Sequence, residues 1–65
     1  MNILINDTPR ELPVGATLAD AIALLAPVPP FAAAVNQQFV PRSGYAAHAL
    51  QDQDRIEVIR PVTGG

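Results

Sequence analysis

Apolar residues alternate with other residues at the amino end of the chain. Ile3 and Ile5 lie on one face of an extended segment and Leu4 lies on the other. A period of two residues is typical of a strand with one buried face. Residues 7–9 (Asp-Thr-Pro) have the chemistry of a turn, so residues 10–14 are expected to return as a second strand.

The same period returns near the carboxyl end, in residues 55–60. Ile56 and Val58 share one face of this segment, and Ile59 lies on the opposite face. A polar turn, residues 51–54, comes directly before it. The pattern therefore predicts a half-buried strand that closes the domain.

One segment has the period of a helix with a single buried side. Leu18, Ile22 and Leu25 follow the spacing i, i+4, i+7. Thr17 is a good N-cap residue, and Asp20 stands where a capping box needs an acid. The prolines that follow prevent continuation, so we expect a helix of about ten residues.

Between the helix and the last strand, the sequence predicts short elements separated by turns. Residues 31–35 and 38–40 are candidate strands around an Asn-Gln turn at 36–37. Residues 41–44 form a second predicted turn. Residues 45–50 are compatible with either a short helical turn or a strand.

The order strand, strand, helix, then further short strands predicts an α+β fold with a mixed sheet and one main helix packed on one face. At this size the β-grasp (ubiquitin-like) fold fits best. In that fold the first and last strands lie side by side and parallel at the centre of the sheet. The predicted core is Ile3, Ile5, Leu18, Ile22, Leu25, Ile56 and Val58.

Length, charge and cysteine content exclude several classes of protein. The chain has 65 residues, four Arg, no Lys, no Cys and a formal net charge of −2. One small domain is expected, without disulfides or thiolate metal sites. Four scattered arginines do not make the clustered basic surface that nucleic-acid binding needs. No apolar run has the length of a signal peptide or a membrane span, so we expect a cytoplasmic protein with no membrane partner.

Candidate catalytic side chains are few. His48 is the single histidine and has no Cys beside it in the sequence, so a partly exposed ring near a turn is expected. Asp52 and Asp54 are expected to be solvated turn residues that bond to their own backbone. We therefore predict no catalytic residue and no metal site in this chain, which makes a stand-alone enzyme the least supported class.

The carboxyl end carries the distinctive chemistry. Pro61 cannot donate a hydrogen bond to a sheet, so we expect a domain of residues 1–60 and a flexible tail of residues 61–65. Such a tail reaches at most about 17 Å. Gly64 and Gly65 make a thin thread that a partner's cleft can enclose. The terminal carboxylate must be activated before it can react, for instance as an acyl-adenylate, and it can carry sulfur as a thiocarboxylate.

Three segments together closely resemble the ThiS family, the sulfur carrier proteins of thiamine biosynthesis: residues 35–42, residues 50–57 and the terminal Gly64-Gly65. The resemblance extends over essentially the whole chain. It implies that a ThiF-type enzyme uses ATP and magnesium to adenylate Gly65. A sulfur-donating enzyme would then load sulfur, and thiazole synthase (ThiG) would receive it. In this reading Thr63, Gly64 and Gly65 thread into the partner, and the chain itself binds no cofactor.

One departure from the family concerns a turn. Family members commonly have Gly-Asp where this chain has Gln53-Asp54. A different backbone conformation is therefore expected in this turn.

Two alternatives remain open. The end Pro-Val-Thr-Gly-Gly, residues 61–65, also resembles MoaD, the small subunit of molybdopterin synthase, which is another thiocarboxylate carrier of the same fold. The Val-Pro-Arg segment at 40–42 and the short length favour thiamine. The second alternative is a non-covalent β-grasp binding module, for which the carboxyl terminus would have no role.

A docking surface is expected on the sheet face away from the helix. Leu4 and Ile59 should project together from that face, with Phe39 beside them. An exposed apolar patch of this kind often marks a partner surface. Arg42 and Arg60 are further candidates, because they could steer an acidic partner.

Overall fold

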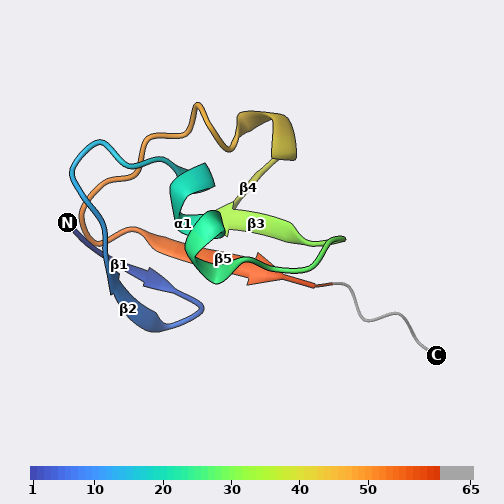
Figure 1. The fold of residues 1–65 in the computed structure, drawn as a ribbon, viewed down its shortest axis with the longest axis horizontal. Coiled ribbons are helices and arrows are strands. Elements are labelled where there is room, and N and C mark those ends of the chain that lie inside the picture. Colours follow the sequence, from blue (N-terminus) through green and yellow to red (C-terminus); the bar gives the residue numbers. More distant parts are fainter. Residues whose placement is uncertain (61–65) are drawn as a thin grey trace.

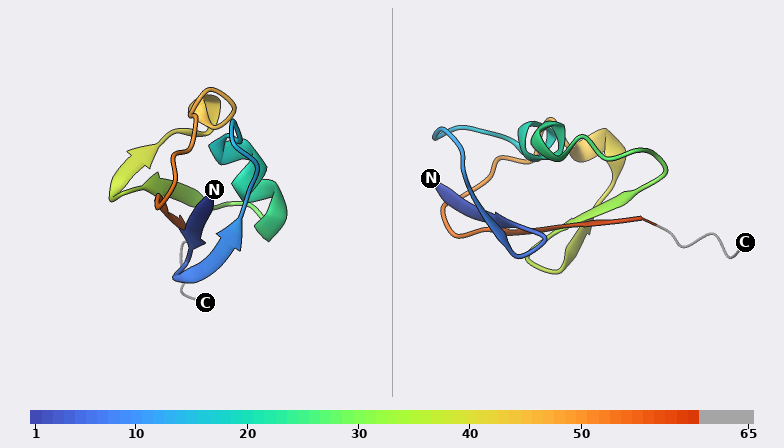
Figure 2. Two further views of the ribbon diagram at one scale, coloured as in Figure 1. Left: turned by 90° about the vertical axis from the view of Figure 1, so that its left-hand side faces the viewer. Right: turned by 60° about the horizontal axis from the view of Figure 1, so that its bottom comes forward.

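A computed structural model describes residues 1–60 as a five-stranded mixed sheet with helices on one face. Figure 1 shows the strands in the order β2-β1-β5-β3-β4. In the right-hand view of Figure 2, the α-helix and a short 3₁₀ helix lie together on one side of the sheet. The elements are β1 (Asn2–Ile5), β2 (Thr8–Glu11), α1 (Leu18–Leu25), β3 (Ala32–Val35), β4 (Gln38–Val40), the 3₁₀ helix η1 (Arg42–Gly44) and β5 (Arg55–Ile59).

The last strand occupies the centre of the sheet. β5 runs parallel to β1, with Ile5 beside Ile56, and antiparallel to β3, with Val35 opposite Ile56. The predicted adjacency of the first and last strands is confirmed. With one α-helix across one face of this sheet, the predicted β-grasp architecture is also confirmed.

The core lies between the sheet and α1. Five of the seven predicted core residues are buried, and Leu25 and Val58 are partly buried and pack against them. The predicted alternation in β5 is also confirmed, because Ile56 is 1% exposed whereas Ile59 is 54% exposed. Buried hydrophobic residues that the prediction left out are Leu12, Ala16, Ala21, Ala33, Val35, Val40 and Leu50.

The helix begins as its sequence predicts. The Asp20 carboxylate accepts hydrogen bonds from the Thr17 backbone N–H at 2.8 Å and the Thr17 hydroxyl at 3.2 Å. Such bonds satisfy groups at the helix start that have no partner inside the helix. α1 has eight residues, slightly fewer than predicted, because Ala26 turns into the left-handed region with a φ of 47°.

The first hairpin differs from the prediction. Its turn lies at Asn6-Asp7, with φ values of 49° and 65°, and β2 is Thr8–Glu11, not residues 10–14. Pro9 is accommodated within β2 because this is an edge strand. Pro9 pairs with Leu4, whose backbone N–H donates to the Asp54 carbonyl at 3.0 Å and so points away from β2. No ladder hydrogen bond from Pro9 is needed there.

The second hairpin is confirmed. β3 and β4 flank a turn at Asn36-Gln37, with φ values of 51° and 69°. The predicted turn at 41–44 contains η1, and in the ambiguous segment 45–50 a turn is followed by an isolated bridge between Ala49 and Thr17. A different backbone conformation was expected at Gln53, because the proteins that this chain resembles commonly have glycine there. Gln53 instead has a φ of 74°, which lies in the left-handed region that favours glycine.

Candidate functional site

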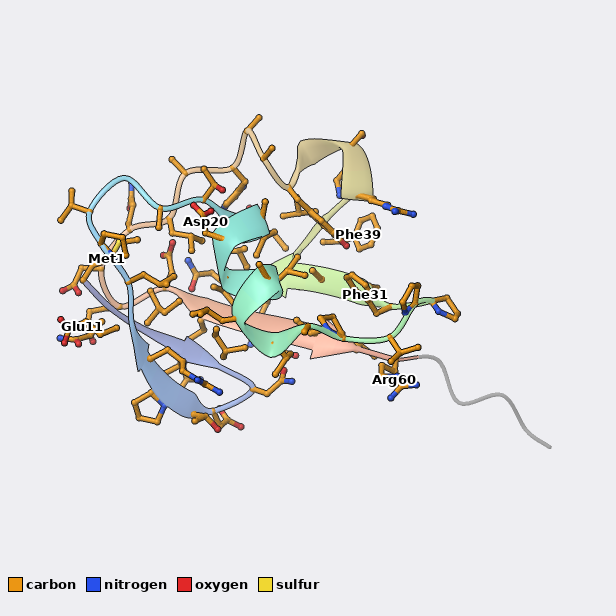
Figure 3. The ribbon with its side chains drawn as sticks, in the orientation of Figure 1. Met1, Glu11, Asp20, Phe31, Phe39 and Arg60 are labelled. Carbon is orange, nitrogen blue, oxygen red and sulfur yellow. The ribbon has the colours of Figure 1, made fainter. Side chains whose placement is uncertain are left out.

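The residues predicted to react and to thread into a partner, Thr63, Gly64 and Gly65, lie outside the described residues, as does the whole predicted tail of residues 61–65. The structure does show the strand that leads to them. β5 ends at Ile59, and Arg60 follows it. Figure 3 shows Arg60 at the end of the ribbon opposite Met1 and Glu11.

β5 is held on both sides up to its last residues. On one side Val58 and Ile59 pair with Ala33 and Ala32 of β3. On the other side β1 has already ended, and the Asn6 side chain accepts a hydrogen bond from the Val58 backbone N–H at 2.9 Å. Asn6 was not among the residues predicted from the sequence to have a functional role. Its only local signal is an asparagine at the first position of a two-residue turn.

Two large apolar side chains stand on the outer face of the sheet, away from α1. Phe39 is 68% exposed and Ile59 is 54% exposed. Phe39 lies opposite Ala34, and Ile59 lies opposite Ala32. The small alanines between them leave a shallow surface, which we call the apolar patch (Ala32, Ala34, Phe39 and Ile59). Contiguous apolar surface of this kind is typical of a protein interaction site.

Leu4 shares the outer face but does not adjoin Ile59. Leu4 pairs with Arg55, four residues before Ile59, which places it about 13 Å back along β5. Glu57 lies between them, and Leu4, Asn6 and Glu57 line a depression at that point. Leu4 is also only half-exposed. Leu4 and Ile59 therefore project from the same face as expected, but they are not adjacent, whereas Phe39 does lie toward the same end as Ile59.

The two arginines are placed differently. Arg42 belongs to η1 and lines a depression with Pro29, Phe31 and Tyr45, on the same side of the sheet as α1. The Phe31 and Tyr45 rings are stacked there with their centroids 6.3 Å apart. Arg60, in contrast, directly follows β5. The structure thus separates Arg42 from the apolar patch and places Arg60 one residue after Ile59.

The two acids of the loop before β5 behave differently from each other. Asp54 is only 8% exposed, so its predicted solvation is wrong. Its carboxylate accepts hydrogen bonds from the Gln51 backbone N–H at 2.8 Å and from the Asn36 side chain at 2.9 Å. Asp52 is exposed, and its carboxylate accepts a bond from the Asn2 N–H at 2.6 Å. Each acid thus has separate structural partners.

Other candidate chemistry is limited in the part of the chain that the structure describes. His48 is half-buried, and its backbone carbonyl accepts a hydrogen bond from the Leu18 N–H at 2.9 Å. Within residues 1–60, no cluster of three or more His, Cys, Asp or Glu side chains could hold a metal ion. In the same residues, no helix combines the length and hydrophobicity required to span a bilayer.

Comparison with known proteins gives three concordant matches. The sequence model of the ThiS family matches residues 3–65. The chain is 38% identical over 66 residues to the sulfur carrier protein ThiS of Escherichia coli (strain K12), and the alignment covers all of both chains. The fold is similar to the crystal structure of the thiamine biosynthesis protein (ThiS) from Geobacter metallireducens, with a TM-score of 0.82, 19% identity and full coverage of both chains.

Proposed function

Since this chain belongs to the ThiS family, we propose that it is a sulfur carrier protein of thiamine biosynthesis. Its Gly65 carboxylate is adenylated and then converted to a thiocarboxylate, which donates the sulfur of the thiazole ring. The observation that carries this proposal is the 38% identity over its full length to a protein described as a sulfur carrier. The family match runs through residue 65 and so includes the Gly64-Gly65 pair.

The proposed chemistry needs only a carboxylate from this chain. An oxygen of the Gly65 carboxylate attacks the α-phosphorus of ATP, and pyrophosphate leaves. The outer sulfur of a persulfide on a sulfur-donating enzyme then attacks the acyl-adenylate carbon, and AMP leaves. The product is an acyl disulfide. A thiol of a partner enzyme attacks the inner sulfur of that disulfide, which forms a new disulfide on the partner and releases Gly65 as the thiocarboxylate. The carrier is in this scheme a co-substrate, and the catalytic groups belong to its partners.

The proposed partners follow from this scheme. A ThiF-type enzyme with ATP and magnesium adenylates the carrier, a sulfur-donating enzyme loads it, and thiazole synthase (ThiG) accepts the sulfur. A cytoplasmic location is part of the proposal because the first step consumes ATP. The family match favours this pathway over a MoaD-like role in molybdopterin synthesis.

We also propose that these partners dock on the apolar patch. Phe39 and Ile59 provide exposed apolar surface on the strands that end nearest Arg60, so a protein covering them would lie close to the point where β5 ends. Arg60 adds a cation at this edge. Leu4 and Glu57 form the rim of this surface, whereas Arg42 lies on the other side of the sheet.

The experiment that tests the carrier function is adenylation of purified protein by its cognate activating enzyme. With magnesium and ATP, we expect release of pyrophosphate for the wild-type chain. Deletion of Gly65, or addition of one alanine after it, should abolish the release. The control Val14→Ala, at a site that is 90% exposed, should be adenylated like the wild type.

Mass spectrometry of protein purified from its own cells tests the same proposal independently. Replacement of oxygen by sulfur adds about 16 Da, and fragment ions must place that change at Gly65, because oxidation of Met1 gives nearly the same shift. If the chain without Gly65 kept its full function in those cells, the terminal carboxylate would have no role, and the protein would instead be a non-covalent binding module.

A further inference from the structure

Two asparagines occupy equivalent positions in the two hairpins of the sheet. Asn6 and Asn36 are each the first residue of a two-residue turn, and their φ values are 49° and 51°. Each donates its backbone N–H to a carbonyl of β5: Asn6 to Ile56 at 2.9 Å, and Asn36 to Arg55 at 2.8 Å. Both turns therefore lie directly against the central strand.

The side chain of Asn6 extends the ladder between β1 and β5 by one hydrogen bond. The backbone N–H of Leu4 donates to the carbonyl of Asp54, just before β5, and the backbone N–H of Asn6 donates to the carbonyl of Ile56 in β5. The even spacing of a parallel ladder would next pair the Asn6 carbonyl with the Val58 N–H. At Asn6 the backbone turns away, and its side-chain oxygen accepts from Val58 at 2.9 Å instead. The Asn6 amide also donates to the Val58 carbonyl at 3.4 Å.

At the opposite end of β5, the Asn36 side chain likewise replaces a backbone carbonyl as a hydrogen-bond acceptor. Its side-chain oxygen accepts a hydrogen bond from the Arg55 N–H at 3.0 Å, where the antiparallel register would place the Asn36 carbonyl. Its amide donates to the buried Asp54 carboxylate at 2.9 Å. Asn36 therefore fixes the first residue of β5, whereas Asn6 fixes the residue before its last.

We propose that Asn6 is a positioning residue for the reactive carboxyl end, because it holds β5 at Val58 where β1 no longer can. This inference rests on the proposed function, in which Gly65 must enter a partner's active site. Without the Asn6 side chain, the end of β5 is held by β3 on one side only. Ordering that segment on docking then costs conformational entropy, which raises KM but leaves the chemistry at Gly65 unchanged.

The test compares Asn6→Gly with Asn36→Gly. Glycine accepts the positive φ of both turns, so each variant removes the side-chain hydrogen bonds but retains the turn. For adenylation by the cognate enzyme, we expect Asn6→Gly to raise the KM for the carrier about threefold to tenfold with kcat within about twofold of wild type. Asn36→Gly is the matched control, and its KM should stay within about twofold of the wild-type value.

Amide hydrogen exchange of the free protein gives a second measurement that needs no partner. In Asn6→Gly the Val58 N–H should exchange at least about tenfold faster relative to the Ile56 N–H. Asn36→Gly should leave this ratio unchanged and accelerate exchange at Arg55. Asn6→Asp keeps an acceptor for the Val58 N–H and should preserve its protection.

Three results would overturn the proposal: an unchanged KM in Asn6→Gly, an equal rise in Asn36→Gly, or a raised KM with unchanged exchange at Val58. The last result would show that Asn6 touches the partner directly. If wild-type protein is not adenylated, the proposed function fails instead. The exchange ratio at Val58 still decides in that case whether Asn6 holds the strand.

Discussion

Single polar side chains join the amino end of this protein to the loop before its last strand. The exposed Asp52 carboxylate accepts a hydrogen bond from the Asn2 backbone N–H at 2.6 Å and a second from the Gln53 side chain at 3.2 Å. The bond from Asn2 is the main reason that the pKa of Asp52 lies below its ordinary value of 3.8. The ionised form is favoured by folding because both donors require an acceptor oxygen.

This lowered pKa predicts how stability depends on pH. A carboxyl group with a lower pKa in the folded state stabilises the protein above its unfolded pKa, and that stabilisation is lost as pH falls through the folded pKa. An asparagine at position 52 cannot ionise. The free energy of unfolding of Asp52→Asn should therefore fall less than that of wild type as the pH falls from about 5, above the ordinary pKa of an aspartate carboxyl, to about 2, below it. Urea unfolding at several pH values measures this. A constant difference between the two proteins over that range would contradict the prediction.

Asp54 shows why the type of a residue and its local turn are not enough to predict whether its side chain is solvated. An acid in a polar turn is usually solvated, and Asp52 follows that rule. Asp54 does not, because its carboxylate accepts hydrogen bonds from the Gln51 backbone N–H in its own turn and from Asn36, 18 residues away. Asn36 belongs to the β3–β4 hairpin, so the residues around Asp54 in the sequence do not reveal this second partner.

At the scale of elements, residues close together in the sequence correctly predicted α1 and the second hairpin. The capping box at Thr17 and Asp20 and the turn at Asn36-Gln37 act through neighbours in the sequence. The first hairpin was misplaced because Pro9 was assigned to the turn. Its tolerance within a strand depends on β2 being an edge strand, which is a property of the assembled sheet.

The second hairpin supports a prediction about stability. Gln37 has a φ of 69°, in the left-handed region that is unfavourable for residues with a Cβ atom. Gln37→Gly should raise the free energy of unfolding by about 0.5–1 kcal/mol, because relief of this strain exceeds the entropy that glycine adds to the unfolded chain.

The neighbouring residue provides the control. Gln38→Gly, in the extended strand β4, should lower the free energy of unfolding by about 0.5–1 kcal/mol. Denaturation by urea compares the two variants with wild type. Equal destabilisation by both glycines would show that the turn does not strain Gln37.

At the scale of the whole molecule, the sheet assembles a surface that no single element contains. Phe39 comes from β4, Ala34 from β3 and Ile59 from β5. β3 and β4 form one hairpin, but β5 is distant from them in the sequence and becomes the neighbour of β3 only in the folded sheet. Figure 3 shows Phe39 and Arg60 toward the same end of the molecule, away from Met1. The proposed docking surface and the strand leading to Gly65 therefore share one end of the fold.

This arrangement predicts the effect of a charge on the outer face. Ile59→Asp should weaken binding to the activating enzyme by about tenfold or more, because docking would desolvate an unpaired carboxylate. The fold should be retained because Ile59 is 54% exposed.

Val14→Asp is the matched control, since Val14 is an exposed apolar residue in a loop outside the sheet. Isothermal titration with the activating enzyme measures both variants, and circular dichroism checks their folding. Equal affinity of Ile59→Asp and wild type would exclude the apolar patch as the docking surface.

The sequence by itself determined the periodic elements, the helix cap, the inward faces of the first and last strands and the Gly64-Gly65 end, because each depends on residues close together in the chain. Tertiary structure decided the burial of Asp54, the rim position of Leu4 and the hydrogen bond that joins Asn6 to Val58 across 52 residues. These features depend on which strands become neighbours. A parallel pairing of the first strand with the last creates contacts that local patterns do not encode.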